Sequence, residues 1–179
     1  MDFERLTEKT KGFLQAAQTL AMRNSHQSLE PEHLLKVMLD DAEGFAAKLL
    51  QAAGADVKTL RQAVERALTK IPVVSGSGAG QLRLSSDLAR LIDNALILSE
   101  KSGDKYVTTE RVLQAMILAK KTDVAGYLEE SGLTDKKLNE AVNAMRKGRT
   151  ADSASAEDQF EALQKYAHDL TQAARDGKL

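Results

Sequence analysis

Histidines are the first candidates for chemistry in this chain of 179 residues, which has three of them and no cysteine. His26, His33 and His168 lie far apart and have no carboxylate companions at the spacing that a metal site needs. His33 falls in the first turn of a predicted helix, where a packing or surface role is far commoner than metal binding. We therefore expect no metal ligands among them.

Two glycine-containing stretches resemble phosphate-binding loops only superficially. The run Gly-Ser-Gly-Ala-Gly at 76–80 follows no convincing strand, and neither Gly-Lys-Ser nor Gly-Lys-Thr closes it. Gly177-Lys178 is followed by Leu179 and has no glycine at the required upstream spacing. No local signature of a Ser/His/Asp or Cys/His arrangement stands out. The sequence predicts that this chain is not itself an enzyme and holds no cofactor, ATP included.

Asp104 and Glu110 are the acids that could recognise a partner. Asp104 lies in the predicted turn 102–105, where Asp often hydrogen-bonds its own backbone. Glu110 lies in the first turn of a predicted helix, where its charge complements the helix dipole. These local roles explain both residues without a ligand, and a recognition role stays open beside them.

The composition restricts the class of protein and its partners. The chain carries 25 basic and 26 acidic side chains and no basic block of five, which argues against nucleic acid or an anionic membrane as partner. The N-terminal residues 1–5 are charged and lack the apolar core of a signal peptide, and no apolar run has the length of a membrane span. With no cysteine, the chain suits a reducing compartment. We expect a soluble, helical, cytoplasmic protein.

An internal duplication sets the organisation of the chain. Residues 6–68 and 84–146 align at a constant offset of 78 without a gap, and thirteen of the 63 aligned positions are identical, where about four would be expected by chance. These positions are mostly apolar: Leu6/Leu84, Ala17/Ala95, Leu20/Leu98, Glu32/Glu110, Leu35/Leu113, Met38/Met116, Ala47/Ala125, Leu50/Leu128, Gly54/Gly132, Lys58/Lys136, Leu60/Leu138, Ala63/Ala141 and Val64/Val142. One copy would be marginally stable alone, so the copies should pack together and bind ligands near their junction.

Each copy is predicted to contain four helices. The first follows Thr7 or Ser85, whose hydroxyls can accept hydrogen bonds from free backbone N–H groups. Its buried face has helical spacing and comprises Phe13, Leu14, Ala17, Leu20 and Ala21 in one copy and Leu88, Leu91, Ile92, Ala95 and Leu98 in the other. The second helix begins at Pro31 after an N-cap at Glu30, and the second copy repeats this after Thr108.

The remaining elements complete an all-α fold of two pseudo-repeated four-helix units, eight helices in all, packed as one domain over residues 1–147. The repeats span about 6–70 and 84–147, joined by an extended connector at 71–83. The third helices are predicted at about 43–53 and 122–131, ending at Gly54 and Gly132, and the fourth begin after Asp56 and Thr134.

The end of the chain is predicted to differ from the duplicated part. Residues 148–156 are small and polar, which favours a flexible linker. Phe160, Leu163, Ala167, Leu170 and Ala174 then give an amphipathic helix at about 157–176. That helix either docks back on the domain or packs against something outside this chain.

Specific motifs resemble the N-terminal repeats of the Clp family. Residues 6–10 (Leu-Thr-Glu-Lys-Thr) and 30–35 (Glu-Pro-Glu-His-Leu-Leu) resemble the first repeat, and residues 103–110 (Gly-Asp-Lys-Tyr-Val-Thr-Thr-Glu) resemble the second. The tail 157–179 looks like the lead-in helix of an AAA+ ATPase module of the ClpB-type disaggregases. The resemblance covers nearly the whole chain and stops short of nucleotide-binding motifs.

This resemblance implies a role in protein disaggregation. ClpB-type proteins are hexameric ATP-driven chaperones that thread aggregated polypeptides and work with the DnaK system, with ATP and magnesium bound in the ATPase modules. Their N-domain engages unfolded or aggregated polypeptides, and Thr7, Asp104 and Glu110 match residues implicated in substrate handling. The isolated chain is then expected to be a monomer. The alternative within the family is an adaptor-docking domain of the ClpA or ClpC type, which feeds a protease.

An apolar groove is the expected source of affinity for such substrates. Equivalent helices of duplicated lobes meet at a seam, and such seams can bind extended or helical apolar peptides. We take Leu91, Ala95 and Leu98 as candidate lining residues. Thr7, Asp104 and Glu110 would then add polar selectivity, although a role in the core is the simpler explanation for any single apolar residue.

Overall fold

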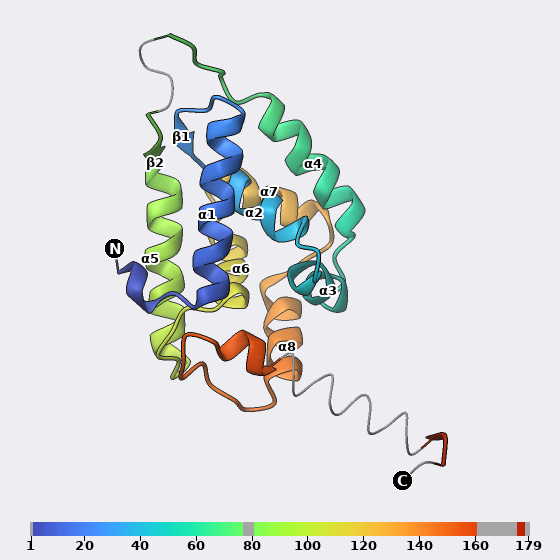
Figure 1. Ribbon diagram of the computed structural model, residues 1–179. Helices are drawn as coiled ribbons and strands as arrows, with labels where there is room; N and C mark the ends of the chain where they lie inside the picture. The colour runs from blue at the N-terminus through green and yellow to red at the C-terminus, as the bar shows by residue number, and fades with distance from the viewer. Residues whose placement is uncertain (1, 77–80, 161–174, 178–179) are drawn as a thin grey trace.

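The predicted all-α architecture is confirmed by the computed structural model, which describes residues 2–76, 81–160 and 175–177 (Figure 1). The described part contains a short 3-10 helix, η1 (Phe3–Arg5), and two strands, β1 (Ser28–Leu29) and β2 (Arg83–Leu84). Its α-helices are α1 (Glu8–Arg23), α2 (Pro31–Leu39), α3 (Phe45–Ala52), α4 (Val57–Thr69), α5 (Ser86–Lys101), α6 (Thr109–Leu118), α7 (Asp123–Glu130) and α8 (Asp135–Arg146).

The helices begin where the sequence predicts caps. Thr7 Oγ1 accepts a hydrogen bond from the Thr10 N–H at 3.2 Å, and Ser85 Oγ accepts from the Leu88 N–H at 3.0 Å. Pro31 opens α2, and the Glu30 N–H donates to His33 Nδ1 at 2.9 Å in a reciprocal capping box that the sequence reading did not include. The first turns of α1, α2 and α5 are therefore fixed by their own local sequence.

The two repeats exchange equivalent backbone pairings. Leu29 pairs with Leu84 in the parallel β1–β2 ladder, and Leu6 pairs with Val107 in an isolated parallel bridge. Since the repeat offset is 78, these two pairs are the same contact made twice with the repeats interchanged. The strands were not predicted, because two residues are too few to show a period of two. This reciprocal pairing indicates a pseudo-two-fold relation that brings the start of each repeat beside the second helix of the other.

A single aliphatic core contains residues of both repeats. Helix α6 is buried along almost its whole length, and α3 and α4 of the first repeat contact α6, α7 and α8 of the second. Gly132 has φ +100°, and a Cβ there would lie 3.3 Å from the Gly54 carbonyl oxygen, so the equivalent glycines meet across the pseudo-two-fold relation. The largest fully buried side chains are Leu6, Leu34, Leu35, Met38, Leu39, Leu50, Leu60, Leu88, Leu91, Leu113, Met116 and Ile117.

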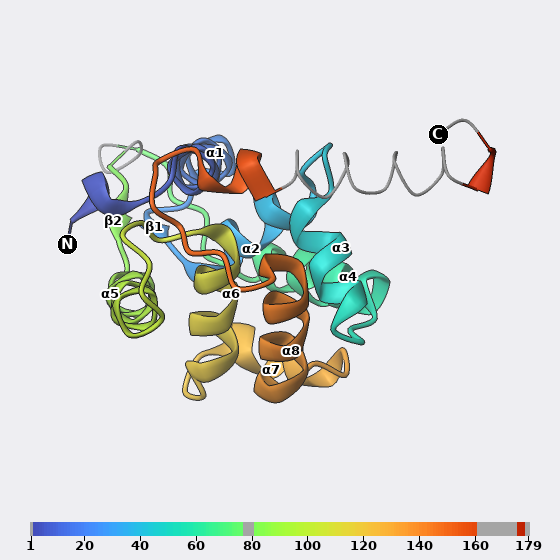
Figure 2. The ribbon, with the colours of Figure 1, turned by 90° about the horizontal axis from the view of Figure 1, so that it is seen from below.

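The segment after α8 returns to the domain. Residues 148–160 loop beneath the lower ends of α1, α5 and α8 (Figures 1 and 2). Ala151, Ala156 and Phe160 are buried as a second small cluster, and a helix begins at Ala156. The flexible linker predicted at 148–156 is thus seen in a packed conformation, and most of the predicted helix at 157–176 lies outside the described residues.

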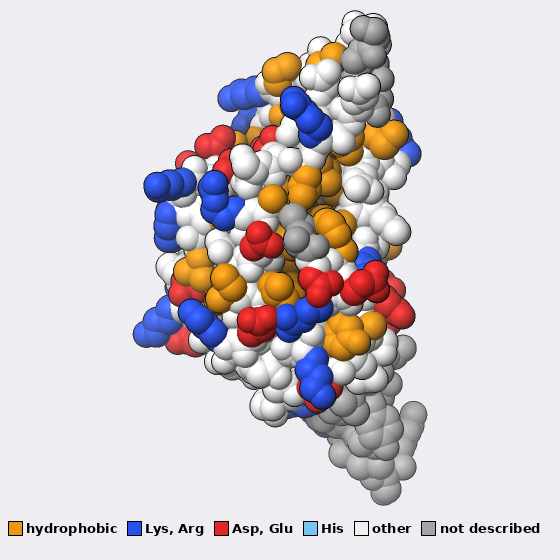
Figure 3. Space-filling view, turned by 90° about the vertical axis from the view of Figure 1, so that its left-hand side faces the viewer, with side chains coloured by type: hydrophobic (Ala, Val, Ile, Leu, Met, Phe, Trp, Pro, Cys, Tyr) orange, Lys and Arg blue, Asp and Glu red, His pale blue; other side chains and the backbone are white. Residues whose placement is uncertain are grey.

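The exposed face over α5 and β2 is mixed in character. Figure 3 shows hydrophobic side chains interspersed with charged ones on this side of the molecule. The larger exposed hydrophobic residues of the elements on this side are Phe3, Leu84 and Ile97, each 40–48% exposed. Such scattered groups are ordinary for a protein surface and do not by themselves mark a binding site.

Candidate functional site

Arg146 is the centre of a buried polar cluster where the two repeats meet. Its Nη1 donates to Asp104 Oδ1 at 2.6 Å, and its Nε and Nη2 donate to Glu110 Oε1 at 2.9 and 2.7 Å. Nη2 also donates to Thr108 Oγ1 at 2.9 Å. The arginine is 3% exposed, Asp104 is 4% exposed and Glu110 is fully buried. One guanidinium at the end of α8 therefore joins the turn before α6 to the first turn of that helix.

A second arginine completes the surroundings of Asp104. Arg111 Nε donates to Asp104 Oδ2 at 2.9 Å, and its Nη1 donates to Gln114 Oε1 at 2.8 Å. Burial acts to raise the pKa of Asp104, but hydrogen bonds from Arg146, the Ala151 N–H and Arg111 outweigh it and hold that pKa below its usual value. Asp104 is thus an ionised, fully partnered acceptor.

Glu157 occupies a cradle formed by the N-termini of α1 and α6. Its Oε1 accepts hydrogen bonds from Thr7 Oγ1 at 2.5 Å and from the Thr109 N–H at 3.1 Å, and its Oε2 accepts from Thr109 Oγ1 at 2.9 Å. The two helix N-termini favour a carboxylate at this point. Burial, followed by the nearby charge of Glu110, nevertheless raises the pKa of Glu157 to about 7.

The cluster carries one more acid than base. Asp104, Glu110 and Glu157 are its acids, and Arg111 and Arg146 are its bases, which gives a formal charge of −1 with every group ionised. Glu110 Oε2 is buried without a hydrogen-bond partner. An excess negative charge in a buried site is unfavourable, so this arrangement favours uptake of one proton or departure of one acid.

The chain's own segment 151–160 covers this cluster. The Ala151 N–H donates to Asp104 Oδ1 at 2.9 Å, and the Ala151 carbonyl accepts from the Lys105 and Tyr106 N–H groups at 2.9 and 3.1 Å. Further along, the Ala154 carbonyl accepts from the Glu8 N–H at 2.8 Å. These bonds use the backbone of the covering segment, so they depend little on its sequence.

Phe160 closes the cluster from the same side. The Arg146 and Arg149 guanidinium carbons lie 5.3 and 5.0 Å from the centroid of its ring, and the ring is 3% exposed. Arg149 also donates to the carbonyls of Met145 and Arg146 at the end of α8. Cation–π contacts of this kind add to the burial that holds residues 148–160 on the domain.

The predicted polar site residues come together in the structure. Asp104 and Glu110 share Arg146 as a hydrogen-bond partner, and Thr7, from a distant segment, bonds to the neighbouring Glu157. All three are buried and hydrogen-bonded inside the domain. A polypeptide could touch them only after residues 151–157 had moved away.

The predicted apolar lining residues lie elsewhere. Leu91 and Ala95 are 1% and 0% exposed in the main core, and Leu98 is half-buried against it. In this conformation Leu91 and Ala95 have almost no surface to offer, and a ligand would reach them only if α5 moved. Their assignment to a substrate groove stays a prediction.

Three charged residues of the cluster were missed by the sequence reading: Arg111, Arg146 and Glu157. The repeat offset held the signal for the two arginines, because Asp104, Arg111 and Arg146 align with His26, His33 and Leu68 in the first repeat. When an acid and two arginines together replace uncharged residues at aligned positions, this indicates that the three charged residues contact one another. Glu157 lies beyond the repeats and gives no such signal.

The equivalent place in the first repeat holds a neutral pair. His33 Nδ1 accepts from the Glu30 N–H, so its proton is on Nε2, which donates to His26 Nδ1 at 2.8 Å. Burial and then the neighbouring His26 lower the pKa of His33 to about 4. His33 is fully buried, so it packs as a neutral core residue.

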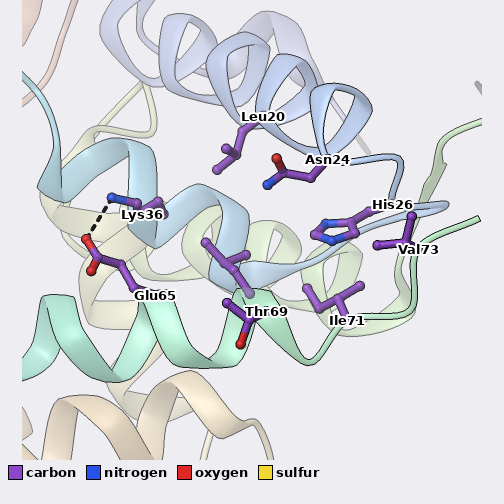
Figure 4. A pocket seen from close by; sticks show the side chains of 9 residues that line it. Leu20, Asn24, His26, Lys36, Glu65, Thr69, Ile71 and Val73 are labelled. Atoms are coloured by element: carbon purple, nitrogen blue, oxygen red, sulfur yellow. Dashed lines mark hydrogen bonds and ion pairs between the residues drawn. The ribbon is translucent and has the colours of Figure 1, made fainter.

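A shallow groove of about 400 Å³ lies beside this histidine pair (Figure 4). It is lined by Leu20, Asn24, His26, Lys36, Glu65, Leu68, Thr69, Ile71 and Val73. Ile71 and Val73 align with Arg149 and Ala151 at the repeat offset. The groove in the first repeat is therefore open at a place that is covered in the second repeat, since Val73 is 70% exposed whereas Ala151 is buried.

Metal binding and membrane insertion can be addressed for the described part of the chain. Within residues 2–76, 81–160 and 175–177, no three His, Cys, Asp or Glu side chains are grouped as metal ligands. Over the same ranges, no helix has both the length and the apolar character needed to cross a lipid bilayer.

Comparison with known proteins identifies the fold. Residues 5–131 match the family of the Clp repeat (R) N-terminal domain. The chain belongs to this family. Among solved structures, the N-terminal domain of Hsp104 from Candida albicans has a TM-score of 0.73 and 20% sequence identity, covering 84% of this chain and 97% of that one. A complex of the ClpV N-domain with a VipB peptide has a TM-score of 0.64 and 20% identity, covering 78% and 86%.

Curated relatives of this Clp N-domain are chaperones. It is 53% identical over 179 residues to the chaperone protein ClpB of Rhodopseudomonas palustris, covering 100% of this chain and 20% of that protein. It is 34% identical over 180 residues to ClpB of Rickettsia felis, covering 100% and 21%. The chain thus spans about a fifth of the length of these relatives and matches their N-terminal part.

Proposed function

We propose that this domain captures unfolded or aggregated polypeptides for a ClpB-type disaggregase. The main support within the molecule is the cluster at the junction of the repeats, where Thr7, Asp104 and Glu110 lie near N–H groups that bond to the backbone of another segment. Backbone recognition of this kind suits a module that must accept many sequences. Weak binding by one domain would be compensated by several linked copies in an oligomer.

The wider setting follows from the same family relation. The parent protein is a hexamer in the cytoplasm whose ATPase modules bind ATP and magnesium and which works with the DnaK system. The present chain contributes binding rather than catalysis and is itself a monomer. No nucleic acid or membrane is needed for this role, in keeping with its formal charge of −1.

Fluorescence anisotropy with labelled lactalbumin tests polypeptide capture. Reduced, carboxymethylated lactalbumin stays unfolded and is the probe, and native lactalbumin with the same label is the control. We expect saturable binding of the unfolded form and none of the native form. No saturable binding of the unfolded form would contradict the proposal and would favour the adaptor-docking alternative.

Isothermal titration calorimetry with ATP tests whether nucleotide binding belongs to other modules of the parent protein. The chain is expected to give no binding heat with ATP and magnesium, because its sequence lacks a phosphate loop. Stoichiometric binding of ATP would contradict the assignment of nucleotide chemistry to other modules of the parent.

A further inference from the structure

The covering segment is held as a bound peptide would be. Ala151 makes backbone hydrogen bonds on both sides, with its N–H to Asp104 and its carbonyl to Lys105 and Tyr106. The Ala154 carbonyl adds a bond from the Glu8 N–H. A chain of different sequence that follows the same backbone path could make all of these bonds, because none of them uses a side chain of the segment.

Among the buried side chains of the segment, which include Ala156 and Phe160, Glu157 and Ala151 lie nearest the acids and threonines of the cluster. Glu157 is 1% exposed, and its carboxyl group lies in the cradle formed by Thr7 and Thr109. Ala151 is fully buried, so a small side chain fits the position beside Asp104. A ligand for this face would therefore have a small residue followed, six positions later, by an acidic one, with a turn into a helix between the two as in residues 151–157.

The segment is also placed so that it can leave. It follows Gly148, which has φ +82°, and residues 148–156 are all small or polar. Its acid enters a cluster whose two acids and two bases are formally balanced without it, and brings the formal charge to −1 beside the unpartnered Glu110 Oε2. The negative charge of Glu110 thus opposes the docking of Glu157, while hydrogen bonds and burial favour the docking of the segment.

We propose that this face is a peptide-binding site whose resident ligand is the chain's own segment 151–160, and that an acidic segment of a substrate takes its place. This inference rests on the proposed function, because it names the substrate class of the same site. Segment docking and substrate capture then exclude each other. Thr7 and Asp104 serve both states, holding the segment at rest and the substrate after exchange, while Glu110 acts on the segment only through its charge.

The test uses Glu157→Ala in the full chain, with Asp158→Ala as its matched control. The two acids are neighbours, but Asp158 is exposed and Glu157 is buried. Neither change touches the cores of α1 to α8, so both variants are expected to fold. Amide hydrogen exchange at Glu8, Lys105 and Tyr106, which donate to the segment, reports docking in each variant.

We expect exchange at these three amides to rise about tenfold in Glu157→Ala and to stay unchanged in Asp158→Ala, as for a segment that passes from mostly docked to mostly free. The free site should then bind a synthetic peptide of residues 150–160 and unfolded lactalbumin about tenfold more tightly than the wild-type chain does. A peptide with Ala in place of Glu157 should bind more weakly than the native peptide.

Three results would separate the inference from the proposed function. Unchanged exchange in Glu157→Ala would overturn the docking of the segment. Faster exchange without a gain in affinity for lactalbumin would overturn the competition, while any binding of lactalbumin by the wild type would leave the proposed function standing. If Glu157→Ala binds the synthetic peptide but not lactalbumin, the peptide site is upheld and the proposed function is overturned.

Discussion

Substitution of Arg146 by leucine is the sharpest test of the buried cluster. Leucine is the residue at the aligned position 68 of the first repeat, so its size and helical preference suit this place. The change removes the four hydrogen bonds that Arg146 makes to Asp104, Glu110 and Thr108. It leaves Glu110 buried without a counter-charge.

The expected loss of unfolding free energy is about 3–5 kcal/mol, the range found when one partner of a buried ion pair is removed. Asp104 keeps Arg111 as a partner, which limits the loss. Since a domain of this size has an unfolding free energy of about 5–15 kcal/mol, the variant should fold but be markedly weakened. Its melting temperature should fall by about 6–20 °C, at roughly 2–4 °C per kcal/mol.

Urea unfolding followed by circular dichroism measures this loss, with Arg149→Leu as the control. Arg149 is a half-buried arginine three residues away that donates only to backbone carbonyls and lies over Phe160, so its loss should cost less than about 1 kcal/mol. Adding Glu110→Gln to Arg146→Leu should restore part of the stability, because it removes the uncompensated charge. A loss below about 1 kcal/mol for Arg146→Leu would refute this account of the cluster.

Three further predictions follow from particular residues. Docking raises the pKa of Glu157 from 4.5 to about 7, so docking is strongest below pH 4.5 and weakens as the pH rises through 7; amide exchange should show this loss, and Glu157→Gln should abolish it. Folding lowers the pKa of His33 from 6.5 to about 4. Its contribution to the free energy of unfolding is therefore full above pH 6.5 and declines by up to about 3 kcal/mol as the pH falls to 4. In urea unfolding, the free energy of the wild type should fall more steeply over this pH range than that of His33→Leu. Gly132→Ala should lose about 1–3 kcal/mol of unfolding free energy because of its positive φ and the nearby Gly54 carbonyl, whereas Gly126→Ala in α7, with open space around it, should gain about 0.5–1 kcal/mol; equal effects in urea unfolding would contradict the argument from φ.

Local chemistry explains why so much of the fold could be predicted. Caps at Thr7, Ser85 and Asp56 and the proline at the start of α2 act within a few residues, and the structure has each of these caps. The repeat offset added long-range information, because two aligned copies must share a core. The short strand pairings could not be predicted, since they depend on how the repeats face each other.

The site was harder to predict because its parts are distant in sequence. Arg146 lies 42 residues from Asp104, and Thr7 lies 150 residues from Glu157, so no local pattern joins them. Small residues at 148–156 suggested flexibility, yet the small size of Ala151 is also what allows it to be buried. Leu91 and Ala95 show the limit of periodicity, which marks an apolar face without telling whether core or ligand covers it.

An NMR titration of the isotope-labelled wild-type chain with unfolded lactalbumin tests the central claim most directly. The account predicts saturable shifts at the amides of Glu8, Lys105 and Tyr106, as the substrate replaces residues 151–160 on their N–H groups. Saturable binding that leaves these amides unmoved would place substrate elsewhere on the domain and contradict the account.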